Sequence, residues 1–211
     1  MNQLIPAILA PDEKTFRERL SLVEQDFSII QIDVMDGAFV PNRSWFDAEV
    51  VASIKTPTNF ELHLMVVDPA RYIEQAQAIP YITRLIWHIE VTVNHDELID
   101  RCHTYGKQAG LAISPTTQID RLNMYTDKLD EILVMGAEPG FSGQSLQPQT
   151  IERAREIHTR WPSIPVGFDI NVNRETIPAL KQADISRFCA ASAIFNNTDP
   201  QKEAAILRSL L

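Results

Sequence analysis

The chain has 211 residues, and its 19 lysines and arginines stand against 28 aspartates and glutamates, which gives a net charge of −9. This acidic balance argues against non-specific binding to nucleic acid, which needs a surplus of basic side chains. Two cysteines are too few for the disulfide framework of a small secreted protein, and no apolar run approaches the length of a membrane span. The N-terminal segment lacks the pattern of a signal peptide, so we expect a cytoplasmic protein with no membrane partner.

Eight short segments rich in apolar and β-branched residues recur along the chain. Most are apolar at nearly every position, which is typical of strands that other elements cover on both faces. They span residues 5–9, 29–34, 60–65, 85–89, 109–113, 131–135, 164–168 and 187–191.

The segments between these strands carry helix signals. Residues suited to cap a helix or to precede one are Asp12, Asp68, Asn94, Thr150, Asn173 and Asp199. Prolines after Asp68 and Asp199 fit the first turn of a helix, whereas the segment 117–125 is short and has a weaker pattern.

The alternation of strand and helix predicts a single (β/α)8 TIM barrel that occupies residues 1–211 as one domain. A doubly wound parallel sheet is the alternative fold, but such sheets more usually have five or six strands. In a barrel of this kind the active site lies at the C-terminal ends of the strands. Polar side chains at those ends are therefore the first candidates for function.

Two carboxylates stand out at these positions. Asp33 lies inside an apolar segment and Asp169 closes another, and a buried carboxylate is costly unless it is paired or bound to metal. His63 lies on the strand next to that of Asp33, so the two side chains could share a cation. The acids could approach one carbon atom from opposite faces. The structural alternative is that Asp169 only prepares the next helix cap.

Other polar residues favour structural interpretations. Asp36 followed by glycine is typical of a turn, and His88 on an apolar strand is more often a hydrogen-bonded interior residue than a ligand. The loop that contains Gly143 could offer backbone N–H groups to an anion. Phosphate sites of barrels usually follow strands seven and eight, where Ala191 and Ser192 stand.

Three methionines end predicted strands: Met35, Met65 and Met135. Methionines at such positions usually fill gaps in a core, but three together can also form an apolar lining above a reactive carbon.

Several of these residues belong to longer motifs that occur in a fixed order. The motifs are Asp-Val-Met-Asp-Gly at 33–37, His-Leu-Met at 63–65, His-x-Glu at 88–90, Pro-Gly-Phe-Ser-Gly-Gln-Ser at 139–145, Asp169, and Ser-Ala-Ile-Phe at 192–195. This set resembles the ribulose-phosphate 3-epimerase family over nearly the whole chain. The family is a (β/α)8 barrel whose members invert the carbon next to the ketone of a sugar phosphate, typically interconverting ribulose 5-phosphate and xylulose 5-phosphate.

The resemblance implies roles for the residues at these positions. Asp33 and Asp169 would be the acid/base pair, and a divalent ion such as zinc, manganese, iron or magnesium would be held by Asp33, His63 and Asp169. The ion would stabilise the enediolate, and Met35, Met65 and Met135 would cover it. Gly143, Ser192 and Ala191 would contact the phosphate of the substrate. Family members are often oligomers, so we expect a homo-oligomer.

The chain also departs from the family pattern. Gln31 stands where the family has a further histidine ligand, and an amide oxygen is a poorer ligand for zinc than an imidazole. Ile170 and Asn171 replace a pair of glycines that contacts phosphate, and Ala191 replaces another glycine. We expect that Ile170 cannot adopt a positive φ, as glycine does.

These departures leave two alternatives open beside a ketose-phosphate epimerase. One is an epimerase that acts on a different or unphosphorylated sugar. The other is a non-catalytic descendant that binds a sugar phosphate or a protein partner. The presence of both Asp33 and Asp169 argues against the second, because a protein without catalysis need not keep two costly carboxylates.

Overall fold

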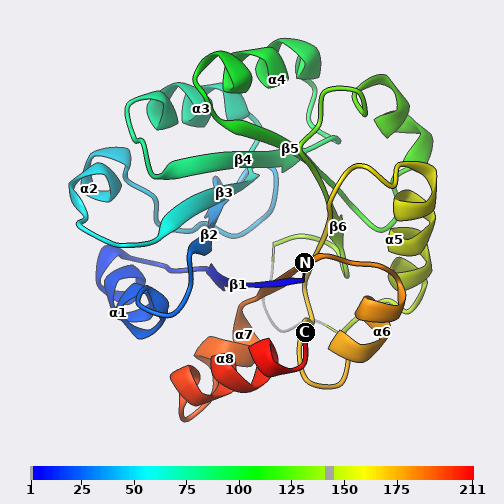
Figure 1. The fold of residues 1–211 in the computed structure, drawn as a ribbon. Helices are drawn as coiled ribbons and strands as arrows, with labels where there is room; N and C mark the ends of the chain where they lie inside the picture. Colours follow the sequence, from blue (N-terminus) through cyan, green and yellow to red (C-terminus); the bar gives the residue numbers. More distant parts are fainter. Residues whose placement is uncertain (1, 141–144) are drawn as a thin grey trace.

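The computed structural model describes residues 2–140 and 145–211, and eight parallel strands form a closed barrel in it. Helices surround this barrel on the outside (Figure 1). The strands are β1 (Gln3–Ile8), β2 (Ile29–Met35), β3 (Asn59–Met65), β4 (Ile82–His88), β5 (Gln108–Ile113), β6 (Glu131–Met135), β7 (Val166–Asp169) and β8 (Arg187–Ala190). Each strand pairs with the next, and β8 pairs with β1, so the predicted TIM barrel is confirmed over the doubly wound sheet.

Three of the six predicted capping residues cap a helix in the structure. The helices are α1 (Glu13–Val23), α2 (Ala48–Ser53), α3 (Pro69–Gln77), α4 (His95–Thr104), the 3-10 helix η1 (Ile119–Met124), α5 (Gln149–Arg160), α6 (Ile177–Gln182), α7 (Ser192–Phe195) and α8 (Pro200–Ser209). The side chains of Asp12, Asn94 and Asp199 accept hydrogen bonds from backbone N–H groups in the first turns of their helices. Asp68 precedes α3 without such a bond in the described structure.

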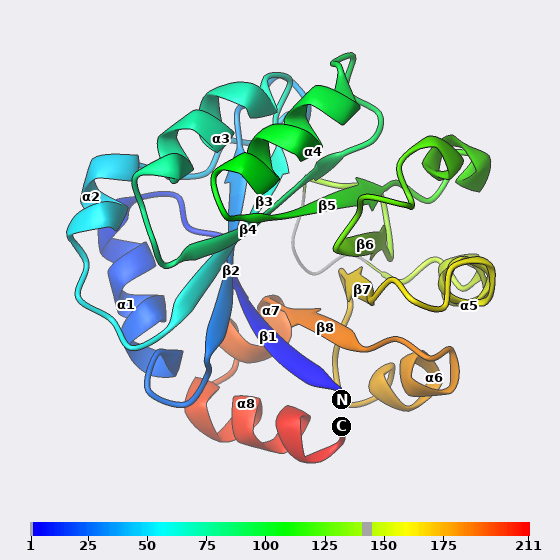
Figure 2. The ribbon, with the colours of Figure 1, turned by 45° about the horizontal axis from the view of Figure 1, so that its top comes forward.

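The two ends of the chain lie side by side, as both ribbon views show (Figure 2). The side-chain amide of Asn2 donates a hydrogen bond to the carbonyl oxygen of Leu211 over 3.3 Å. The first and last helices are therefore neighbours, and α8 completes the ring of helices next to α1.

Several strand boundaries differ from the predicted ones, and two of the differences have local reasons. The segment predicted from residue 164 becomes a strand only at Val166, because Pro165 has no N–H to donate to a neighbouring strand. The strand predicted from residue 85 already begins at Ile82. The prediction started too late because Thr83 and Arg84 are polar and interrupt the apolar pattern, although they belong to the strand.

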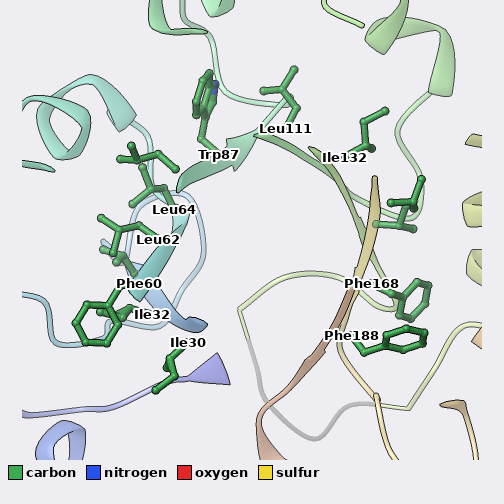
Figure 3. Close-up of a cluster of buried hydrophobic side chains, with 14 of the residues drawn as sticks. Ile30, Ile32, Phe60, Leu62, Leu64, Trp87, Leu111, Ile132, Phe168 and Phe188 are labelled. Atoms are coloured by element: carbon green, nitrogen blue, oxygen red, sulfur yellow. The ribbon is translucent and has the colours of Figure 1, made fainter. Parts of the chain in front are cut away.

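The two-residue period of the strands separates two sets of buried side chains. On β2 and β3, Ile30, Ile32, Phe60, Leu62 and Leu64 belong to the large cluster beneath the helices. Figure 3 shows these side chains pointing away from the barrel interior. The residues between them therefore face inward, and that inner set includes the polar residues of the site.

The lower part of the barrel interior holds a buried cluster of four charged residues, Glu61, Arg84, Glu131 and Arg187. They lie in the N-terminal halves of β3, β4, β6 and β8. Arg84 Nη1 lies 2.9 Å from Glu61 Oε2 and 2.8 Å from Glu131 Oε2, and Arg187 contacts both glutamates as well. The negative charges of the two carboxylates and the positive charges of the two guanidinium groups balance each other there.

We predict that Glu61→Gln destabilises the protein by about 3–5 kcal/mol, because it leaves two buried guanidinium groups with one carboxylate. Denaturant unfolding followed by circular dichroism measures this loss. Glu175→Gln at an exposed position is the matched control and should change the free energy of unfolding by less than about 0.5 kcal/mol. Equal stabilities of the two variants would contradict the prediction.

Candidate active site

Three inward-facing side chains meet at the C-terminal end of the barrel. Asp33 on β2 and His63 on β3 are direct neighbours in the strand register, and Asp169 ends β7. His63 is fully buried, and both aspartates are only 6% exposed. The structure therefore brings together the three residues that the sequence predicts at one site.

The histidine lies between the two carboxylates. His63 Nδ1 is 3.2 Å from Asp33 Oδ1 and 3.2 Å from Asp169 Oδ2. One ligand atom from each residue lies within 4.8 Å of the other two, so this group could hold a metal ion. Three protein ligands with a further position left for water or substrate are the usual composition of a catalytic zinc site.

Gln31 on β2 contributes to the same centre. Its amide Nε2 donates hydrogen bonds to Asp33 Oδ1 over 2.8 Å and to Asp169 Oδ2 over 2.9 Å. Its Oε1 is buried and has no hydrogen-bond partner among the described residues. Rotation of the amide by half a turn would direct this unpartnered oxygen at the centre. Gln31 therefore fits the place of a fourth ligand.

The electrostatic environment favours a protonated histidine in the metal-free site. Burial raises the pKa of Asp33, and the negative charge of Asp169 adds to that rise, although the hydrogen bond with His63 opposes it. Burial by itself lowers the pKa of His63, but the hydrogen bonds and charges of Asp169 and Asp33 outweigh burial and raise the pKa to about 9. Below that pH both ring nitrogens of His63 carry a proton, so a metal ion must displace the proton on Nδ1 before that nitrogen can bind it.

A second line of hydrogen bonds leads outward from His63. Its Nε2 lies 3.1 Å from Nε2 of His88, and Nδ1 of His88 lies 3.2 Å from Glu90 Oε2. The interpretation of His88 as a hydrogen-bonded interior residue is confirmed, because it is fully buried and is not part of the group that could hold a metal. Burial lowers the pKa of His88.

Glu90 is a further residue of this centre that the sequence did not indicate as a site residue. Burial alone would raise its pKa, but hydrogen bonds from His88, Thr117 and the Ser114 backbone lower it to about 2. Glu90 lies in the turn after β4, which ends at His88, so the signal that could have found it is the His-x-Glu motif at 88–90.

A pocket opens over the two aspartates, and both of them line it. It is lined by the three methionines Met35, Met65 and Met135 and by Ile170, Ala191 and Ser192. Gly143, the other residue expected near phosphate, lies outside the described residues. Asp36 forms the expected turn, because its Oδ1 accepts hydrogen bonds from the N–H groups of Ala38 and Phe39.

The expectation that Ile170 cannot adopt a positive φ is wrong. Ile170 has φ of 76° and Asn171 has φ of 61°, so the loop after β7 keeps a left-handed backbone without glycine. The carbonyl oxygen of Ile170 packs closely against Gly136. A Cβ atom added to Gly136 would lie 2.7 Å from that oxygen. The N–H of Ile170 also donates to Asp169 Oδ1 over 2.7 Å. These contacts hold a conformation that costs a β-branched residue about 1–3 kcal/mol.

Comparison with known proteins agrees with this arrangement. The model of the "Ribulose-phosphate 3 epimerase family" matches residues 3–195 of the chain. The chain belongs to the ribulose-phosphate 3-epimerase family. It is therefore an epimerase, an enzyme of the isomerase class.

Relatives in the ribulose-phosphate 3-epimerase family match almost end to end. A protein named ribulose-phosphate 3-epimerase from Schizosaccharomyces pombe is 30% identical over 98% of this chain and 92% of its own length. A protein of the same name from Chlamydia trachomatis is 34% identical, over 96% of this chain and 90% of its own length. The solved structure of KGPDC from Streptococcus mutans superimposes with a TM-score of 0.74, covering 100% of this chain and 97% of that one. At 10% identity this likeness shows the shared barrel fold alone. No helix within the described residues is long and apolar enough to span a membrane.

We predict that metal binding releases about one proton from His63 below about pH 9, because a cation must displace the hydrogen on Nδ1. The apparent affinity should then weaken about tenfold for each pH unit below that value. Calorimetric titration of Co²⁺ in two buffers of different ionisation enthalpy measures the release. Affinity that does not change between about pH 7 and about pH 9 would contradict the prediction.

Proposed function

We propose that this epimerase inverts C3 of a ketose phosphate such as D-ribulose 5-phosphate, which gives D-xylulose 5-phosphate. The observation that carries the proposal is the convergence of Asp33 and Asp169, from non-adjacent strands, on one pocket with His63 between them. The names of the relatives support the choice of substrate.

The two carboxylates supply the proton transfers. One takes the C3 hydrogen from one face of the substrate as a general base, and the other returns a hydrogen to the opposite face as a general acid. One of the pair must begin each turnover protonated. Asp33 is suited to that state, because burial raises its pKa. Reversal of the roles then returns the product to the substrate.

A hydrogen next to a ketone is too weakly acidic for a carboxylate to remove unless the developing oxyanion is stabilised. Asp33, His63 and Asp169 would hold the divalent ion, with Gln31 Oε1 in the fourth position. The ion supplies Lewis-acid stabilisation of the enediolate oxygens. A ligand set of one imidazole, two carboxylates and an amide favours harder ions such as magnesium or manganese more than a site with two histidines does. Zinc and iron remain within the proposal.

The side chains around the pocket bear on the substrate. The three methionines Met35, Met65 and Met135 give an apolar cover over the carbon that loses its hydrogen. Ser192 and Ala191, at the start of α7, are the described residues proposed to meet the phosphate, together with Gly143. We also propose, from the sequence, that residues 1–211 act as one domain in a cytoplasmic homo-oligomer.

A different or unphosphorylated sugar is the second candidate substrate. The observation that favours it is the side chain of Ile170, which lines the pocket together with Ala191 where the family has glycines. Both side chains reduce the room for a phosphate group to approach the backbone.

Hydrogen exchange at C3 tests the proposal directly. The protein is incubated in D₂O with D-ribulose 5-phosphate and, separately, with D-ribulose, and deuterium at C3 and the formation of xylulose products are followed by NMR. We expect exchange and epimerisation of the phosphorylated sugar. Faster reaction of the unphosphorylated sugar would move the assignment to the second candidate, and no exchange with either sugar would reject the proposed inversion at C3 of these ketoses.

We predict that Asp169→Asn lowers the rate of epimerisation by about 10²–10⁴-fold, because it keeps the shape of the side chain and removes the base. Its melting temperature should stay close to that of the wild type. Asp127→Asn at an exposed position is the matched control and should leave the rate unchanged. Full activity of Asp169→Asn would remove the two-carboxylate mechanism.

We predict that Gln31→His raises the affinity for zinc by roughly 10-fold or more, because an imidazole replaces an amide as a ligand. Titration of chelator-treated protein, followed by calorimetry and by activity, measures the change. Gln77→His on the exposed end of α3 is the control for an added histidine. If neither the wild type nor Gln31→His binds a divalent ion, the metal site is rejected. If affinity stays the same, Gln31 does not hold a ligand position.

A further inference from the structure

We propose that Glu90 is a positioning residue that determines, through His88, which ring nitrogen of His63 carries hydrogen when that ring is neutral. The observation is the continuous path from the Ser114 backbone to the two aspartates, in which every link is a contact of 2.9–3.2 Å. The effect on metal binding rests on the proposed function, whereas the effect on the histidines does not.

A hydrogen bond to one carboxylate oxygen, Oε1, fixes the orientation of the Glu90 side chain. Glu90 Oε1 accepts a hydrogen bond from the backbone N–H of Ser114 over 2.9 Å. A backbone N–H can only donate, so this oxygen must act as an acceptor. The other oxygen, Oε2, is then left for Nδ1 of His88 at 3.2 Å. The side chain is only 20% exposed, which limits competition from water for this contact.

The carboxylate of Glu90 determines the tautomer of His88. A carboxylate oxygen accepts hydrogen bonds, so Nδ1 of His88 must carry hydrogen and donate it. In the neutral ring Nε2 then has a lone pair, which faces Nε2 of His63 at 3.1 Å. The ring of Phe39 packs on the His88 ring with centroids 4.7 Å apart, which helps to hold the ring orientation.

The tautomer of His88 in turn determines that of His63. Two imidazole nitrogens at hydrogen-bond distance need one hydrogen between them, and His88 offers a lone pair, so Nε2 of His63 must carry that hydrogen. In the neutral ring the lone pair of Nδ1 is then directed at Asp33 and Asp169, where a cation would lie. Without a cation, the amide of Gln31 is left as the donor to both carboxylates. A hydrogen-bond partner behind a histidine ligand fixes its tautomer and ring orientation in this way.

Glu90→Gln tests the proposal, because the backbone N–H of Ser114 dictates how the new amide is oriented. The amide oxygen must face that N–H, so the NH₂ group faces Nδ1 of His88 and turns that nitrogen into an acceptor. His88 then carries hydrogen on Nε2 and donates to His63, and His63 carries its hydrogen on Nδ1. Both histidines reverse their tautomers, and the lone pair of His63 is directed away from the aspartates.

The first measurement uses metal-free protein with ¹⁵N-labelled histidine, at a pH at which the spectra themselves show both rings to be neutral. Long-range ¹H–¹⁵N NMR spectra distinguish the two ring nitrogens. We expect hydrogen on Nδ1 of His88 and on Nε2 of His63 in the wild type, and the reverse at both rings in Glu90→Gln. Glu49→Gln, at an exposed position, should show the wild-type pattern. Hydrogen on Nε2 of His88 in the wild type would overturn the proposal even if Glu90→Gln did not fold.

The second measurement is the affinity for Co²⁺, read from its absorption spectrum. We expect it to fall about 10–100-fold in Glu90→Gln, as is typical when the partner behind a histidine ligand is lost, and to recover at least in part in Glu90→Asp, which keeps a carboxylate. Wild-type tautomers and affinity in Glu90→Gln would overturn the inference and leave the metal site intact. If the tautomers reverse but no variant binds Co²⁺, the inference about Glu90 stands and the proposed metal site fails.

Discussion

Two carboxylates that face each other across a buried histidine impose the main physical constraint on this protein. Asp33 and Asp169 are almost fully buried, and each is 3.2 Å from the same nitrogen of His63. Two like charges in a site from which water is largely excluded repel each other, so the site needs a cation or hydrogen-bond donors between them. His63 and the amide of Gln31 meet that need, and the placement of both follows from the alternation of side chains on β2 and β3.

The opposite end of the barrel solves the same electrostatic problem in a different way. Glu61 and Glu131 are also buried inside the barrel, but Arg84 and Arg187 contact both of them. The charges there balance without any added ion, which is consistent with a structural role. At the upper end two aspartates share one histidine, which supplies at most one positive charge. The unbalanced end is the one that opens into the pocket, so the distribution of charge along the barrel axis separates stability from function.

The sequence predicts those parts of the molecule that follow from repeated local patterns. The barrel comes from eight apolar segments, and the site comes from carboxylates toward their C-terminal ends, where a barrel has its active site. Glu61 and Glu131 also lie within such segments, but toward the N-terminal ends, and they belong to the balanced cluster. The short helices α2 and α7 were not predicted, whereas α6, also of six residues, was, because Ile177, Leu180 and Ala183 follow a helical spacing there. The φ of Ile170 was wrongly predicted because the close packing against Gly136 depends on residues far apart in the sequence. The role of Glu90 depends on a contact with Ser114, which only the strand register reveals.

Gln31, which stands where the family has a histidine, shows how the exchange of one uncharged side chain for another can change the balance between the metal-free and the metal-bound site. An amide NH₂ group has two hydrogens, and Gln31 donates to both aspartates at once, over 2.8 Å and 2.9 Å. A neutral histidine at that position could donate only one hydrogen, and it would be the better ligand for zinc. Gln31 therefore stabilises the carboxylates when no cation is present, and as the proposed fourth ligand it would bind a cation less strongly than a histidine. Both effects act in the same direction, so the exchange of one neutral side chain would shift the equilibrium toward the metal-free site without changing the charge of the centre.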